Sequence, residues 1–377
     1  MIDCASIAAG FFALALAVHF LSALLAYLKH RRGRAPADAT CRGAVTIVRP
    51  VCGLDHFDEL TLRSTFALCY ADLELIFCAA RENDRAVALV RALIAEHSDV
   101  RAKLLVGDER PTANPKLNNI VKGWRAARTE WVILADSNVL MPPDYVEQLM
   151  AAFEPDVGLV CSPPLGSWPI GFAAEVECAF LNTYQARWQC AADAIGFGFA
   201  QGKSMLWRRD GLNAAGGIEA LGLEIAEDAA ATKIVRAQGK RVRLVARPFE
   251  QPLGVRRARQ VWDRQVRWAR LRRATFPLYY APEILTGSFA PMVALAAAAF
   301  DADIDVATAL AGGVTVWYGA EAALALAAGW HLRWMSPFAW MLRDLMLPAL
   351  WIEGLCGDAF TWRGNDMTVA SSGSAAR

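Results

Sequence analysis

The chain has 377 residues, enough for one large domain or two of ordinary size. Hydrophobic residues make up 55% of it and the mean hydropathy is +0.25, so part of the chain is expected to lie in lipid. The net charge of +1 gives no support to nucleic-acid binding, and nine cysteines without CxxC spacing argue against a disulfide scaffold or a structural zinc site.

The first apolar segment has the length and flanking charge of a membrane anchor. Residues 4–28 contain no Asp, Glu, Lys or Arg, and 25 such residues can cross a bilayer as a helix. The basic sequence KHRRGR follows at once, and the positive-inside rule places that end in the cytoplasm. A cleaved signal peptide, the alternative, carries its positive charges before the apolar run. The sequence therefore predicts a retained anchor at 1–30.

Residues 42–255 alternate between strand-like and helical segments, which predicts one catalytic domain. The strand-like runs are AVTIVRP, LELIFCAA, AKLLVG, WVILAD and VGLVCS. Helical patterns lie between them, and Asn114 followed by Pro115 is typical of a helix start. This spacing predicts an α/β fold with a mostly parallel sheet covered on both faces. In such a sheet the ligand binds beyond the carboxyl ends of the strands.

Two aspartates are expected at those strand ends. Asp84 follows the second strand-like run, where its carboxylate can accept hydrogen bonds from a nucleoside or can cap the next helix. Asp136 ends WVILAD, and a buried strand that delivers a carboxylate into a crevice is a common way to hold a divalent metal on a diphosphate. Asn138, two residues later, is a weaker, neutral oxygen ligand. We therefore expect Asp136 to bind the metal.

A third carboxylate, Asp228, lies in EIAEDAAATK at the predicted start of a helix, where the helix dipole favours acidic residues. In the functional interpretation Asp228 is a general base that takes the proton of an acceptor hydroxyl, with Glu227 as the alternative. The glycine-rich sequence GFGFAQGKS just before it lacks the spacing of a phosphate-binding P-loop. It is interpreted as a flexible wall of the acceptor pocket.

A basic segment, predicted over 256–280, contains the sequence RQVRW. Arg264 and Arg267 share one face if the segment is helical, so they could neutralise a leaving diphosphate while Trp268 packs against an acceptor or the membrane interface. The alternative is an interfacial helix that binds anionic phospholipid headgroups, and both hold if they use different faces. Three arginines outside RQVRW are expected to face the headgroups: Arg256, Arg257 and Arg259. Flanking apolar sequence argues against nucleic acid as the partner.

Residues 281–357 are predicted to form C-terminal membrane segments. The stretch 284–300 is uncharged, and 306–332 carries only one acidic or basic residue before its last turn, Glu321. The acidic sequence DADID joins them and the basic sequence HLR follows, so the first is expected outside and the second in the cytoplasm.

A third apolar stretch, 334–352, is interrupted by Arg343 and Asp344. It is compatible with a span, a re-entrant hairpin or an interfacial helix. Residues 358–377 are expected to form a polar tail.

The order of these motifs resembles that of the inverting GT-A glycosyltransferases, and most closely the ceramide glucosyltransferases. The resemblance covers roughly residues 5–330. It implies a GT-A, Rossmann-like catalytic domain between membrane helices, a UDP-sugar donor, a lipid hydroxyl as acceptor, and Mg²⁺ or Mn²⁺ as the divalent cation. The matching segments are VTIVRPVCGLD, NPKLNN, AEDAAATK and RQVRWARLR.

The resemblance also implies roles for single residues on the donor side. Asp84 would contact the nucleotide, and Asp136 would hold the metal and the diphosphate. Pro50 and Lys116 lie inside two of the matching segments and complete the expected donor-binding set.

On the catalytic side, Asp228 would be the base, and Arg264, Arg267 and Trp268 would form the RxxRW element. The apolar segments predict a multi-pass protein of the cell inner membrane with its catalytic domain in the cytoplasm, and the resemblance implies that it transfers glucose to ceramide. Two alternatives stay open: the same chemistry on diacylglycerol or a hopanoid, with UDP-glucuronate or UDP-N-acetylglucosamine, and a processive polysaccharide synthase. A non-catalytic membrane receptor is disfavoured by the three placed carboxylates.

Overall fold

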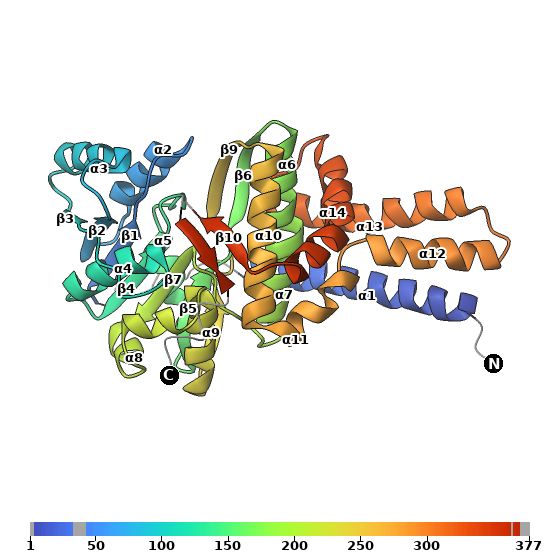
Figure 1. The fold of residues 1–377 in the computed structure, drawn as a ribbon, viewed down its shortest axis with the longest axis horizontal. Helices are drawn as coiled ribbons and strands as arrows, with labels where there is room; N and C mark the ends of the chain where they lie inside the picture. The colour runs from blue at the N-terminus through green and yellow to red at the C-terminus, as the bar shows by residue number, and fades with distance from the viewer. Residues whose placement is uncertain (1–3, 33–42, 363–364, 370–377) are drawn as a thin grey trace. The chain divides into compact units, whose positions relative to one another are not determined.

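The computed structural model describes residues 4–32, 43–362 and 365–369 (Figure 1). The chain divides into two compact units. The sheet unit takes in Arg32–Leu165 and Ala192–Gly254, and the helical unit takes in the chain up to Arg31 together with Gly166–Ala191 and Val255–Val369. The end of the predicted polar tail, 370–377, lies outside the described residues.

The sheet unit is built on seven strands in the order β3-β2-β1-β4-β7-β5-β8. Neighbours pair in parallel, except that β7 runs antiparallel to both β4 and β5. This mostly parallel sheet, with apolar helices near both ends of the chain, confirms the predicted fold class. The strands are β1 (Val45–Pro50), β2 (Leu73–Ala79), β3 (Ala102–Val106), β4 (Trp131–Ala135), β5 (Val157–Ser162), β7 (Ser204–Arg208) and β8 (Arg241–Leu244).

Alternating strand residues place the core of the sheet unit on both faces of the sheet. Ile47 and Leu75 belong to one hydrophobic cluster, and the next residues along each strand, Val48 and Ile76, belong to another. Because side chains alternate across a strand, both faces must be covered. Helices α3 and α5 contribute to the first cluster, and α4 and α9 to the second. The helices of this unit are α2 (Asp58–Arg63), η1 (Ser64–Ala67), α3 (Arg85–Glu96), α4 (Pro115–Ala126), α5 (Tyr145–Ala151), α8 (Arg209–Asn213), η3 (Ile218–Leu223) and α9 (Glu227–Ala237).

The helical unit contains the apolar helices α1 (Cys4–Arg31), α12 (Phe289–Asp301) and α13 (Val306–Ala328), which lie side by side (Figure 1). Within the described ranges, α1 and α13 are long and apolar enough to cross a membrane. Helix α12 has 13 residues, or about 20 Å of helix, which is short for a span. The apolar stretch 284–300 does not form one straight helix. The short helical segment Pro277–Leu285 that precedes α12 meets it at an angle of 41°.

The remaining helices of this unit include the one that carries RxxRW. Helix α6 (Phe172–Ala179) continues into a π-helix (Phe180–Ala186) and then α7 (Arg187–Ala194), and RxxRW lies in α10 (Ala258–Thr275). Two short helices, α11 (Pro277–Tyr280) and η4 (Ala281–Leu285), lead to α12, and α14 (Ser336–Leu355) precedes the hairpin of β10 (Ala359–Trp362) and β11 (Asn365–Thr368). Two of the unit boundaries in the chain fall within β6 (Leu165–Ile170) and β9 (Glu250–Val255).

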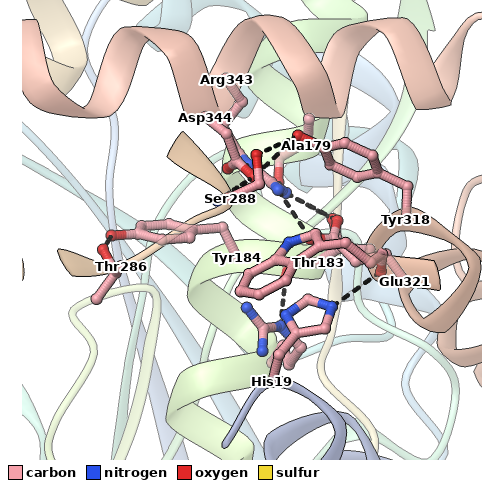
Figure 2. A network of polar contacts seen from close by, with 12 residues as sticks. His19, Ala179, Thr183, Tyr184, Thr286, Ser288, Tyr318, Glu321, Arg343 and Asp344 are labelled. Carbon is pink, nitrogen blue, oxygen red and sulfur yellow. Dashed lines mark hydrogen bonds and ion pairs between the residues drawn. The ribbon is translucent and has the colours of Figure 1, made fainter. Parts of the chain in front are cut away.

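The interrupted apolar stretch 334–352 is one continuous helix, α14, whose charged pair is fully buried (Figure 2). Arg343 donates from both terminal nitrogens to Glu321, at 2.8 and 3.0 Å, and from Nε to Asp344 at 2.7 Å. Asp344 in turn accepts from the Ser288 amide at 2.9 Å and the Tyr318 hydroxyl at 3.1 Å.

This buried network explains how charged residues are tolerated among apolar helices. A buried charge is costly unless it is paired and hydrogen-bonded. Arg343 also reaches Thr183 of the π-helix at 2.8 Å, so one guanidinium joins α14, α13 and the π-helix (Figure 2). The network therefore fixes the positions of α14, α13 and the π-helix relative to one another.

Candidate active site

Asp136, the residue after β4, belongs to a cluster of four charged side chains from separate segments of the sheet unit. Lys116, in the first turn of α4, lies 2.7 Å from Oδ1 of Asp136 and 2.6 Å from Oε1 of Glu227. Lys203, directly before β7, donates to Oδ2 of Asp136 at 2.8 Å. The cluster thus alternates in charge, from Glu227 through Lys116 and Asp136 to Lys203.

Local sequence explains why Lys116 points into this cluster. The side chain of Asn114 accepts hydrogen bonds from the backbone N–H groups of Lys116 and Leu117, and Pro115 occupies the first helical position, as predicted. Asn114 also donates from its amide to Glu227 at 2.8 Å. The residue that caps α4 therefore also ties it to the first residue of α9.

The cluster fixes the charges of its members. Burial lowers the pKa of the Lys116 ammonium, but the carboxylates of Asp136 and Glu227 outweigh that effect and hold the pKa above its usual value. Burial raises the pKa of Asp136, and the facing ammoniums of Lys116 and Lys203 reverse the shift and hold it well below its usual range. Asp136 is therefore ionised at any physiological pH, and its lowered pKa makes it too weak a base to serve as the proton acceptor.

Asp228 differs from its neighbours in the cluster. It accepts from the backbone N–H of Gly202 at 3.3 Å and from that of Ala229 at 2.9 Å. Burial, together with the adjacent Glu227 carboxylate, raises the pKa of Asp228 to about 6. A carboxylate that titrates near neutral pH is suited to act as a proton acceptor there.

The backbone of Gly202 forms hydrogen bonds with two side chains of this site. Its carbonyl accepts from Lys116 at 2.6 Å, and its N–H reaches Asp228. A Cβ at this position would lie 2.7 Å from Oε1 of Glu227 and 3.1 Å from Nζ of Lys116, so only glycine leaves room for that ion pair. Gly202 and Lys203 both come from GFGFAQGKS. The sequence alone suggested a pocket wall for this segment and did not indicate Lys203 as a site residue.

The other two predicted donor-side residues lie at the end of β1 and at the start of α3, in the loop after β2. Asp84 caps α3 by accepting from Ala86 N at 2.9 Å, and it also accepts from the N–H of Gly53 at 2.9 Å. Pro50 is the last residue of β1 and pairs in register with Cys78 of β2. Asp84 therefore both caps a helix and fixes the loop after β1.

A divalent cation is compatible with a single carboxylate here. In the part of the chain that the structure describes, no three His, Cys, Asp or Glu side chains gather as a metal site. Mg²⁺ is commonly held by one or two carboxylates together with substrate phosphates, so Asp136 with the Asn138 oxygen can supply the protein's share. Both oxygens of Asp136 face lysines.

The RxxRW residues belong to the helical unit and lie on α10. Arg264 forms an ion pair with Glu177 of α6. Arg267 and Trp268 are both partly buried. Glu177 was not among the residues that the sequence singled out, because nothing in the local pattern of α6 distinguishes a buried ion-pair partner from an exposed acid.

The expectation that three arginines near the start of α10 all face lipid headgroups is wrong for Arg256. The Arg256 side chain is only 7% exposed and lies 3.3 Å from the buried carboxylate of Glu177. Arg257 is exposed, and the Arg259 side chain is 91% exposed. The basic run therefore contains both a buried and an exposed set of guanidiniums.

Comparison with known proteins places the chain in a family. The model of glycosyl transferase family 21 matches residues 10–375. Ceramide glucosyltransferase 1 of Caenorhabditis elegans is 26% identical over 352 residues, which cover 89% of this chain and 73% of that protein. Ceramide glucosyltransferase 3 of the same organism is 26% identical over 94% of this chain and 79% of its own length.

Among solved structures, the mannosyltransferase PcManGT from Pyrobaculum calidifontis, in complex with GDP-mannose and Mn²⁺, superposes with a TM-score of 0.49 at 19% identity. That alignment covers 92% of this chain and 97% of the other. The family match spans nearly the whole sequence. The chain is therefore an enzyme that belongs to glycosyl transferase family 21.

Proposed function

We propose that this enzyme transfers a sugar, glucose in first place, from a UDP-sugar to the hydroxyl of a membrane lipid, with ceramide as the preferred acceptor. The carboxylate and lysine cluster carries the proposal, because it combines fixed positive charge with a carboxylate whose pKa is about 6. The named activity of the two long relatives and the two candidate spans support a lipid acceptor.

In the proposed reaction Asp228 is the general base. It takes the proton of the acceptor hydroxyl as that oxygen attacks the anomeric carbon of the sugar. The bond between that carbon and the diphosphate oxygen breaks, UDP leaves with the electron pair, and the configuration at the carbon inverts. The base must be ionised before each turnover, and a pKa of about 6 meets this requirement at neutral pH while keeping useful basicity.

The leaving UDP requires positive charge, and the cluster offers two ammoniums for it. Lys116 and Lys203 flank Asp136, and both are held by carboxylate contacts that a bound diphosphate would replace. A cation held by Asp136 and Asn138 would neutralise further phosphate charge. Pro50, at the end of β1, and Asp84, at the start of α3, are proposed to contact the nucleoside.

The helical unit is proposed to serve the leaving group and the acceptor. Arg264 and Arg267 of RxxRW are assigned to the diphosphate, and Trp268 is assigned to the lipid. The exposed Arg257 and Arg259 are assigned to anionic phospholipid headgroups at the cytoplasmic face of the inner membrane. A lipid acceptor loses about 0.8 kcal/mol for each CH₂ that it exposes to water, so transfer is expected at the bilayer surface.

The experiment is a product assay in lipid nanodiscs. Purified enzyme receives UDP-glucose, UDP-glucuronate or UDP-N-acetylglucosamine in separate reactions, with ceramide, diacylglycerol or a hopanoid as acceptor. The masses of the lipid products are then measured by mass spectrometry. UDP-glucose with ceramide should give the fastest product, and turnover should rise when anionic phospholipid replaces neutral lipid. Exclusive use of another acceptor would overturn the ceramide assignment, and sugar polymer without a modified lipid would favour a processive synthase.

A further inference from the structure

Glu177 is a fully buried carboxylate that binds the first arginine of RxxRW. It lies in α6, three residues before the π-helix, and its side chain is 0% exposed. Oε1 of Glu177 pairs with Nη1 of Arg264, and Oε2 lies 3.3 Å from Nε of Arg256. One buried acid thus contacts two arginines, one just before α10 and one in the middle of it.

Such a group is costly to bury unless it is paired, so the contact is unlike the ion pairs on the surface of α10. Removing one partner of a buried pair leaves an uncompensated charge, whereas an exposed pair contributes little. Arg259 and Asp263 form an exposed pair of the second kind on the same helix, at 3.6 Å. The Glu177 contact therefore constrains α10 where the Arg259 contact does not.

The constraint acts on the face of the helix that carries the motif. Residues three and four positions apart are neighbours on a helix surface, so Arg267 and Trp268 lie next to Arg264 on α10. Holding Arg264 at a fixed point of α6 sets the rotation of α10 about its axis, and with it the direction of the two neighbouring side chains. The Arg264 guanidinium is engaged by this contact, and Glu177 shares its single negative charge between Arg264 and Arg256.

We propose that Glu177 is a positioning residue that acts through Arg264, so that Arg264 orients α10 and leaves the diphosphate to Arg267. This inference rests on the proposed function, because it assigns Arg267 and Trp268 to the leaving group and the acceptor. It changes the role given to Arg264 from charge neutralisation to orientation. It also gives Arg256 a structural role in the same contact.

A double-mutant cycle tests the proposal. Glu177→Gln and Arg264→Gln should each lower kcat on the order of 10²-fold with little change in the KM for the donor, because a small misplacement of a catalytic group costs about that much. The double variant should be no slower than the slower single variant, since residues that act as a unit are not additive. Arg264→Lys, which keeps the charge but loses the planar fork, should recover only part of kcat.

The matched control breaks another ion pair of α10. Arg270 pairs with Glu353 of α14 at 2.8 Å, and Glu353→Gln removes that contact without touching RxxRW. Its kcat should equal that of the unaltered enzyme. A loss as large as that of Glu177→Gln would mean that any weakened contact of α10 has this effect, and it would overturn the proposal.

Full kcat for Glu177→Gln, or losses that multiply in the double variant, would also overturn it. If Glu177→Gln does not give a monodisperse protein, Glu177→Asp takes its place in the cycle with the same expected non-additivity. Hydrogen exchange of the α10 amides gives a readout without substrate. Exchange should be faster in each single variant, and no faster in the double variant than in the faster single variant. An unaltered enzyme that makes no lipid product would contradict the proposed function alone, whereas unchanged exchange would contradict the role of Glu177.

Discussion

Lys116 and Asp136 form an ion pair of 2.7 Å that joins the first turn of α4 to the residue after β4. The same ammonium contacts Glu227 at the start of α9, next to Asp228. Segments separated by about a hundred residues therefore converge on one lysine. This contact links the side chains assigned to the donor diphosphate with the carboxylate assigned to the acceptor proton.

Replacing the proposed base should stop transfer without preventing donor binding. Asp228→Asn keeps the shape of the side chain but cannot take a proton, and loss of a general base typically lowers the rate on the order of 10²–10⁴-fold. UDP-sugar binding, measured by calorimetry on the detergent-solubilised enzyme, should stay close to that of the unaltered protein. Near-normal turnover by this variant would remove Asp228 from the role and promote Glu227.

The pH dependence of the reaction should report the environment of Asp228. Below its pKa of about 6 the carboxyl is protonated and cannot act as a base, so kcat/KM should fall as the pH drops through 6. Glu227 is one of the groups that raise this pKa, and Glu227→Gln removes its charge. The acidic limb of the profile should therefore move to lower pH in that variant. A limb that stays in place would show that another group controls it.

A methyl group at Gly202 should disrupt the cluster. The added Cβ would meet Oε1 of Glu227 at 2.7 Å and Nζ of Lys116 at 3.1 Å, so Gly202→Ala must displace that ion pair. Turnover should fall by up to about 10²-fold while the protein stays folded. Gly211→Ala is the control, since its Cβ would meet nothing within 4 Å. Equal activity of both variants would mean that the position of the ion pair is irrelevant to catalysis.

Removal of divalent cations should weaken donor binding through Asp136. Chelator treatment should raise the KM for the UDP-sugar, and Mg²⁺ or Mn²⁺ should restore it. Asp136→Ala should bind the donor weakly with or without cation, whereas Asp136→Glu should recover part of its affinity in excess metal. If chelator does not change donor binding by the unaltered enzyme, the diphosphate is held by Lys116 and Lys203 alone.

Sequence patterns were sufficient for features that depend on neighbouring residues. The parallel strands, the cap of α4 by Asn114 and the cap of α3 by Asp84 follow from periodicity and local chemistry, and all three are present. The order of the motifs also led to the correct family.

Contacts between distant segments could not be predicted in the same way. Lys203 contacts Asp136, which is 67 positions away in the sequence, and Arg264 contacts Glu177, which is 87 positions away. No local pattern encodes either contact. Arg256 shows the same limit, because a basic run suggests exposure of every arginine until a buried acid is found beside one of them. The antiparallel strand β7 was also missed, since its five residues follow a glycine-rich segment rather than a helix.

The central claim is tested most directly by the lipid that purified enzyme makes from UDP-glucose and ceramide in nanodiscs. Mass spectrometry and the anomeric coupling in the proton NMR spectrum give the size of the added sugar and its configuration. The account predicts ceramide carrying one hexose in the β configuration, inverted from the α-linked donor. Release of UDP without any new lipid, or a product that retains the α configuration, would contradict it.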